Sequence, residues 1–137
     1  MKIAEFFKLN SMKKFEYNEF GVCTNPDTIT REFKGCKFTI STATMPKSCT
    51  WVYGVSLILR EGFYFGIPIS LRFHEGEFST EKRAVISACQ FIRKFLLQHP
   101  TGLSSSVYGT IVPLYDKPFR NMLDEVGMDA RQYNLFW

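Results

Sequence analysis

The sequence predicts an α+β domain, in which an antiparallel meander of three to five strands carries one long helix across one face and a short C-terminal helix. Three successive runs in the middle of the chain alternate apolar and polar residues, as half-buried strands do. The spacing then changes to that of an amphipathic helix over residues 79–99. The chain has 137 residues, the length of one domain. We expect a single domain over residues 1–137, with residues 1–11 as an N-terminal extension and residues 128–137 as a C-terminal extension.

The first strand-like pattern is a weak alternation over residues 15–22. The Asn-Pro-Asp sequence within residues 24–28 then favours a turn, because proline fixes φ and its polar neighbours bond nearby backbone. A stronger alternation over residues 37–44 places Phe38 and Ile40 on one face of a strand.

Two further strands complete the predicted meander. Residues 50–60 alternate with apolar residues on both faces, so the pattern leaves open which face meets the helix. Gly62 suits the short link that follows, because glycine adopts a positive φ easily. Residues 66–73 alternate again, and Pro68 there indicates an edge strand or a bulge, because proline lacks a ladder donor.

The helices have recognisable ends. Ser79 is the expected N-cap of the long helix, and Pro100 ends it. After a predicted loop over residues 101–110 and a short strand over residues 110–115, Asp116 is expected to cap a second helix that Gly127 ends. The inward residues of these elements form the predicted core: Phe38, Ile40, Val55, Leu57, Ile69, Leu71, Val85, Cys89, Ile92 and Phe95.

Composition and charge exclude several classes of protein. No apolar run approaches the roughly 18 residues that span a bilayer, so we expect no membrane partner. The net charge of +4 is mild, and its basic residues are scattered, so it permits a nucleic-acid partner without requiring one. The four cysteines and two histidines have no metal-ligand spacing, and we expect no cofactor. Without a signal peptide, a cytoplasmic location with reduced thiols is expected.

No catalytic motif emerges from the nucleophilic residues. Cys89 lies on the apolar face of the long helix, where a structural role is expected, and residues 104–106 lack the Gly-x-Ser-x-Gly pattern. An enzyme that uses Cys23 or Cys49 in a loop remains an alternative.

The segment FGIPISLRFHEGEFSTEKRAVISACQFI carries a resemblance in the order of its elements. Its strand, Ser-Thr signal and helix resemble the β-β-β-α units of HicB-like antitoxin domains and of small phage or mobile-element proteins. Double-stranded-RNA-binding domains have a related order. Their basic helix start is absent here, where only Lys82 and Arg83 are available, and this departs from RNA-duplex binding.

The C-terminal sequence QYNLF resembles the pentapeptide by which bacterial replication and repair proteins dock on the sliding clamp. The resemblance implies that Gln132 is a polar anchor and that Leu135 and Phe136 fill an apolar pocket. The alternative, which we favour, is that Leu135, Phe136 and Trp137 fold back as a hydrophobic clasp.

The function expected from these observations is a small non-enzymatic binding module of a bacterium, phage or mobile element. It would act on nucleic acid or on a protein that processes nucleic acid. The alternative is a protein-interaction or antitoxin-like module that pairs through an exposed sheet edge, with a homodimer as one outcome. The candidate nucleic-acid contacts are the basic residues Lys37, Arg60, Arg72, Lys82, Arg83 and Arg93.

Overall fold

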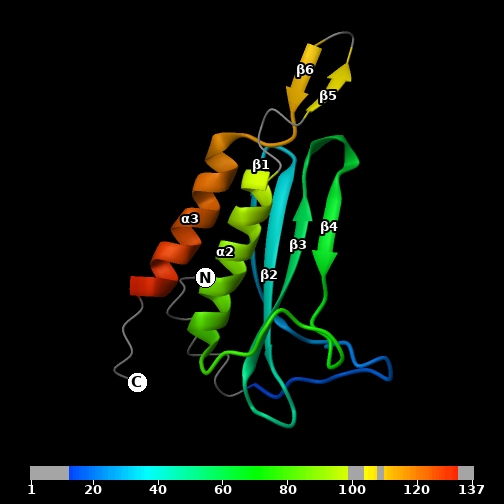
Figure 1. Cartoon of the computed structure of the whole chain (residues 1–137), viewed down its shortest axis with the longest axis vertical. Coiled ribbons are helices and arrows are strands. Elements are labelled where there is room, and N and C mark those ends of the chain that lie inside the picture. The colour runs from blue at the N-terminus through cyan, green and yellow to red at the C-terminus, as the bar shows by residue number, and fades with distance from the viewer. Residues whose placement is uncertain (1–12, 99–103, 108–109, 133–137) are drawn as a thin grey trace.

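A four-stranded antiparallel sheet and two helices packed on one of its faces form the body of the molecule (Figure 1). The computed structural model describes residues 13–98, 104–107 and 110–132. The α+β class and the antiparallel meander are therefore confirmed. The sheet has the order β1-β2-β3-β4, and a separate two-stranded ribbon, β5-β6, precedes the last helix. The elements are β1 (Asp27–Phe33), β2 (Cys36–Thr44), β3 (Trp51–Ile58), the 3-10 turn η1 (Arg60–Gly62), β4 (Tyr64–Ile67), α2 (Glu81–Gln98), β5 (Ser104–Val107), β6 (Thr110–Pro113) and α3 (Lys117–Gln132).

Strands β2 and β3 form the centre of the sheet, as their alternation predicts. Phe38 lies opposite Leu57 and Ile40 opposite Val55, and all four are buried against the helices. The face of β3 that meets the helices, which the sequence left open, is therefore the one that carries Val55 and Leu57. Burial of a residue such as Leu57 stabilises the fold by about 1.5–3 kcal/mol. The larger cluster of buried residues lies on this face, which is therefore the main core.

A second, smaller core lies on the other face of the sheet. It contains Cys23, Ala43, Met45, Val52 and Ile69. The segment before β1 covers it, because the Cys23 amide donates to the Ile69 carbonyl over 3.0 Å. The strand expected over residues 15–22 is wrong: this segment makes only isolated bridges, because it crosses the outer face of the sheet as a cover.

Strand β1 overlaps the end of the turn predicted over residues 24–28 and continues through residues 29–33, for which the sequence pattern predicts no element. Pairing with β2 begins at Asp27, opposite Thr42, and continues to Phe33, opposite Cys36. The expected turn over residues 24–28 therefore ends earlier. The segment DTITREF carries few apolar residues, because an edge strand buries only part of one face.

Strand β4 is an edge strand, as Pro68 indicated, but the expected range of residues 66–73 is wrong. The strand spans Tyr64–Ile67 and stops immediately before the proline. Beyond it the chain turns across the sheet, where the Leu71 amide donates to the Gly21 carbonyl. Leu71 is therefore 40% exposed rather than part of the core.

The long helix α2 is confirmed, with a different cap. Thr80, not Ser79, accepts from the helix: its hydroxyl oxygen receives the Arg83 amide over 3.2 Å and its carbonyl receives the Ala84 amide. Pro100, the predicted stop, lies outside the described residues.

The second helix, α3, continues through Gly127 to Gln132, so the predicted glycine stop is wrong. A Cβ at Gly127 would lie 3.6 Å from Cys89 Cβ, which places the glycine against α2. This separation is an ordinary van der Waals contact, so the glycine faces α2 at a position where a methyl group would also fit. The loop expected over residues 101–110 is also partly wrong, because β5 lies within it and pairs with β6.

Candidate functional site at the β4 edge

The two edges of the sheet differ in chemistry. The β1 edge carries Asp27, Arg31 and Glu32, and α3 packs against it. Charges on an edge strand oppose pairing with another chain, because a bound strand would bury them. The β4 edge reads Tyr-Phe-Gly-Ile and contains no charged residue. Among the described strands of the main sheet, β4 is therefore the edge suited to a protein partner.

The hairpin before β4 holds this edge in place. Gly62 has φ of +72°, which glycine adopts without strain, and this turn lets the Leu59 amide reach the Phe63 carbonyl over 2.9 Å. Arg60 binds Asp116 at the start of α3 with both terminal nitrogens, and the Nη1–Oδ1 distance is 3.3 Å. This hydrogen bond raises the pKa of Arg60 further, so the guanidinium stays charged.

The backbone of β4 directs half of its polar groups away from the sheet. In an antiparallel pair, opposed residues alternate between bonded and non-bonded positions. The bond from Leu59 to Phe63 sets this alternation, so Phe65 and Ile67 bond to β3. The N–H and C=O groups of Tyr64 and Gly66 consequently point outward, as the donors and acceptors that an added strand needs.

An aromatic stack supports β4 on the helix side. Phe65 stacks on Phe95 with ring centroids 4.6 Å apart and on Phe91 at 6.0 Å. Phe63 also contacts Phe95, at 6.0 Å. These rings are only partly buried, so they provide apolar surface beside the open edge.

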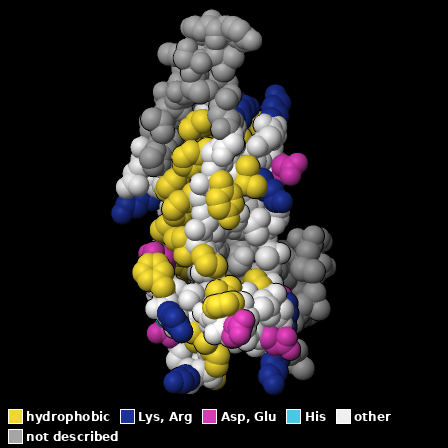
Figure 2. Space-filling view, turned by 90° about the vertical axis from the view of Figure 1, so that its right-hand side faces the viewer, with side chains coloured by type: hydrophobic (Ala, Val, Ile, Leu, Met, Phe, Trp, Pro, Cys, Tyr) yellow, Lys and Arg dark blue, Asp and Glu magenta, His cyan; other side chains and the backbone are white. Residues whose placement is uncertain are grey.

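The opposite side of the same edge is also apolar. Tyr64 is 66% exposed, and Ile58, which pairs with it, is 38% exposed. Figure 2 views the molecule from the β4 side and shows hydrophobic side chains gathered in a band along its long axis, with charged side chains mainly around this band. Phe20, Leu71 and Phe73 add exposed apolar surface beyond the end of β4. Contiguous apolar surface of this kind marks interaction sites.

The six basic residues proposed as nucleic-acid contacts lie at different places. Lys37 and Arg60 are at one end of the sheet, because Lys37 pairs with Ile58. Lys82 and Arg83 lie in the first turn of α2, next to Glu81, which binds Thr42. Thr42 lies about 17 Å from Lys37 along β2. Opposite ends of the sheet therefore hold these two pairs.

Arg60 and Arg93 also hold internal ion pairs. Arg60 binds Asp116, and Arg93 Nε lies 3.4 Å from Asp124 on α3. Arg72 lies in the exposed segment after Ile69. The structure thus does not assemble the six residues into one basic surface.

The clamp-like peptide is described only at its first position. Gln132 is the last residue of α3, whereas Leu135 and Phe136 lie outside the described residues.

The thiols of the enzyme alternative have ordinary surroundings. Cys23 is buried, and burial raises the pKa of its thiol, which disfavours the reactive thiolate. Burial also raises the pKa of Cys89 to about 12. Cys49 is exposed and has a positive φ of +56°. Within the described residues, no group of three or more His, Cys, Asp or Glu side chains is placed to hold a metal ion.

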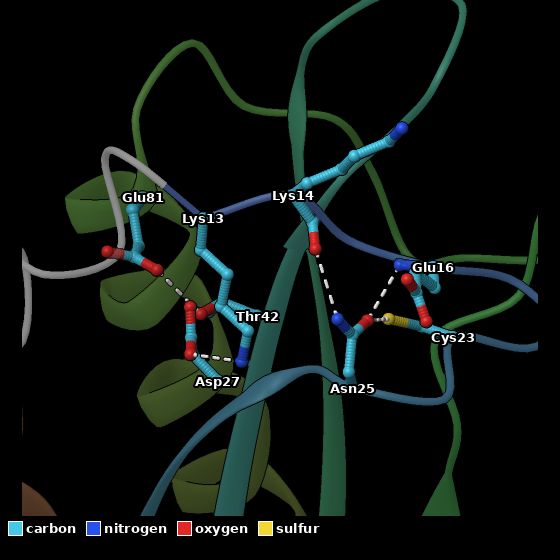
Figure 3. A network of polar contacts seen from close by, with 8 residues as sticks. All are labelled: Lys13, Lys14, Glu16, Cys23, Asn25, Asp27, Thr42 and Glu81. Carbon is cyan, nitrogen blue, oxygen red and sulfur yellow. Dashed lines mark hydrogen bonds and ion pairs between the residues drawn. The ribbon is translucent and has the colours of Figure 1, made fainter.

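A polar network joins the N-terminal segment to the sheet and to α2 (Figure 3). Lys13 binds Asp27 at 2.8 Å, and Thr42, which lies opposite Asp27, donates to Glu81 over 2.9 Å. Beside them, the Asn25 side chain accepts from the Glu16 amide and donates to the Lys14 carbonyl. These bonds tie the N-terminal segment to the sheet and the sheet to the start of α2, and we assign the network a structural role.

A second cluster joins the β2–β3 turn to the segment before α2. Glu77 Oε1 accepts hydrogen bonds from Ser48 Oγ at 2.8 Å and Thr50 Oγ1 at 2.6 Å, and Oε2 lies 3.8 Å from His74 Nε2. These hydrogen bonds lower the pKa of Glu77, and the bond from Thr50 is the largest cause, followed by the bond from Ser48. A Ser-His-acid triad needs the imidazole against the hydroxyl. Here the carboxylate lies between them, so the cluster lacks triad geometry.

Comparison of the chain with protein-family models, with curated proteins and with solved structures gives no match. Among the described residues, no helix has both the length and the apolar character needed to cross a bilayer.

Sequence reasoning included an exposed sheet edge as an alternative but did not locate it. Pro68 is the signal in the sequence for this edge, because a proline beside a strand indicates that the strand is at the edge of a sheet. The absence of charge in residues 64–67 could have selected this edge over residues 27–33.

Proposed function

We propose that the chain is a protein-binding module that accepts an extended segment of a partner protein as an additional strand beside β4. The observation that carries the proposal is the outward direction of the Tyr64 and Gly66 backbone groups along an uncharged edge. Main-chain hydrogen bonds to such an edge give affinity, and the neighbouring apolar surfaces select the side chains of the added strand.

The chemistry of the partner follows from the surfaces beside the edge. Phe65 and the rings under it favour an apolar side chain on the helix side, and the exposed Tyr64 ring favours another on the outer side. Because β4 has four residues, the paired segment is short. An uncharged segment of β-branched or aromatic residues meets these requirements.

The test uses a short peptide of alternating Val and Thr, titrated into the isotope-labelled full chain. Backbone amide signals of Tyr64 and Gly66 should shift most, and affinity should change little between about 50 mM and about 200 mM salt. A Gly66→Pro variant removes one outward donor at a position where an edge strand tolerates proline, so its affinity should fall at least several-fold. Circular dichroism should confirm that this variant remains folded.

The competing function is tested in parallel with a double-stranded oligonucleotide. If the oligonucleotide binds with a steep salt dependence, if Lys82→Gln and Arg83→Gln weaken it, and if the peptide leaves Tyr64 and Gly66 unshifted, the proposal is wrong. In that case the chain is a nucleic-acid-binding module.

A further inference from the structure

We infer that the segment that pairs with β4 is β4 of a second copy of this chain. The inference rests on the proposed function, because it names the occupant of the same edge. The two strands run antiparallel about a two-fold axis beside Phe65, so that two four-stranded sheets form one continuous sheet.

The backbone pattern is self-complementary in this register. With the axis at Phe65, Tyr64 of one copy lies opposite Gly66 of the other, and the reverse pair follows by symmetry. These are the two residues whose N–H and C=O groups point outward, and each such pair exchanges both hydrogen bonds. The same edge therefore satisfies itself.

The side chains on the outer face also fit. A Cβ at Gly66 would lie 2.5 Å from the Tyr64 hydroxyl of its own chain, so the ring already extends along β4 over this glycine. In the symmetric pair, each tyrosine faces a glycine of the other copy, and the two large residues are not directly opposed. The absence of a side chain at Gly66 thus leaves room for the Tyr64 ring of the same chain, so that each ring of the symmetric pair lies over its own strand.

The inner face continues the aromatic stack across the axis. Phe65 of each copy would oppose its counterpart at a non-hydrogen-bonded position, where side chains approach most closely. Each ring rests on its own Phe91 and Phe95. The helices α2 and α3 lie over β1, β2 and β3, so none of the described helices covers the space beyond β4 on this face (Figure 1).

Charge favours β4 over the other edge for pairing between identical copies. Residues Tyr64–Ile67 carry no charge, so two copies do not repel along the paired strands. On β1, pairing would bring Arg31 and Glu32 into the contact, and α3 already packs beside this strand.

The register can be tested by cross-linking. Phe65→Cys, in a chain whose exposed Cys49 is replaced by Asn, should form an intermolecular disulfide through residue 65 under mild oxidation, because opposed non-hydrogen-bonded positions have the required Cβ separation. Asn is chosen because it tolerates the positive φ at position 49. The matched control is Ile67→Cys, on the same face, whose copies would lie about 13 Å apart and should not cross-link.

Sedimentation provides the second measurement, and its test on the unmodified full chain does not depend on the folding of a variant. We expect a monomer–dimer equilibrium that shifts to monomer in Gly66→Pro and changes little with salt. Equal cross-linking of both cysteine variants would overturn the register, and a wild-type monomer at all concentrations up to about 1 mM would overturn the dimer.

The outcomes separate the two proposals. If the wild type remains monomeric while the Val–Thr peptide still shifts the amides of Tyr64 and Gly66, the dimer is wrong and strand acceptance stands. If neither the peptide nor a second copy engages β4, both proposals are wrong.

Discussion

Thr42 and Glu81 are joined by a buried hydrogen bond, in which Thr42 Oγ1 donates to Glu81 Oε2 over 2.9 Å. Thr42 is fully buried on β2, and Glu81 is 6% exposed in the first turn of α2. The bond fixes the start of the long helix to the sheet.

Thr42→Val is expected to lower the free energy of unfolding by about 2 kcal/mol, because a hydrogen bond to a buried carboxylate is lost without a change in shape. Urea unfolding monitored by circular dichroism measures this effect. Thr30→Val is the control, since Thr30 is exposed and bonds to Thr39 across the solvent side, and should change stability by less than about 0.5 kcal/mol. Equal effects of the two substitutions would contradict the assignment.

Two glycines of the sheet should respond differently to alanine. A Cβ at Gly54 would lie 2.7 Å from the Ile67 backbone oxygen, which cannot move without displacing β4, so Gly54→Ala should destabilise by about 2 kcal/mol. At Gly66 the nearest atom is the end of the exposed Tyr64 side chain, which can rotate away. Gly66→Ala should therefore cost less than about 0.5 kcal/mol, and thermal melts of the two variants measure the difference.

The Glu77 cluster predicts a pH-dependent contribution to stability. Because hydrogen bonds from Thr50 and Ser48 lower the pKa of Glu77 in the folded chain, its stabilising effect is present above the unfolded pKa. The effect is lost as pH falls through the folded value. Glu77→Gln should lower the melting temperature near neutral pH, and its difference from the wild type should disappear as pH falls through the folded pKa of Glu77. Glu75→Gln is the charge-matched control, and an equal loss in both variants would refute the role of the two hydroxyls.

The thiols distinguish a binding module from an enzyme. Only Cys49 of the four cysteines is exposed, so a thiol reagent should modify one site rapidly in the folded chain and all four in urea. Peptide mapping identifies the modified residue. Alkylation of Cys49 should leave binding at β4 unchanged, whereas loss of a function with the fold intact would support the cysteine alternative.

The C-terminal residues give a prediction that depends on the sequence alone, because residues 133–137 lie outside the described residues. If Phe136 and Trp137 form a clasp, as we expect, replacing either with alanine should cost on the order of 3 kcal/mol. If they belong to a clamp-binding peptide, stability should not change and the peptide RQYNLFW should bind a bacterial sliding clamp. Calorimetric titration and urea unfolding together decide between the two.

Residues with a strong local pattern could be placed from the sequence. The alternation around Phe38 and Ile40 and the helical spacing that includes Val85 and Ile92 identified β2, β3 and α2, because burial on one face imposes the period. The observed N-cap of α2 is Thr80, one residue after the predicted Ser79. Both side chains carry a hydroxyl that can cap a helix, and the local backbone conformation determines which of them does so.

Elements determined by tertiary contacts could not be placed in this way. Strand β1 has little alternation because it is held mainly by its ladder with β2. The glycine at position 127 reads as a helix end but packs against Cys89 of another helix, which no local pattern reveals. The candidate site depends on which strand ends the sheet and which way Tyr64 faces, and both follow from pairing across the chain.

The two cores on opposite faces of the sheet have a consequence for the order in which the protein opens. Both draw on β2 and β3: Ile40 and Val55 on one side, Ala43 and Val52 on the other. These two strands cannot separate without exposing both cores together. In contrast, β4 and the N-terminal segment can each detach from the sheet while exposing only one core. We therefore expect the amides of the β2–β3 hairpin to exchange most slowly, and β4 to fray and re-form without unfolding of the domain.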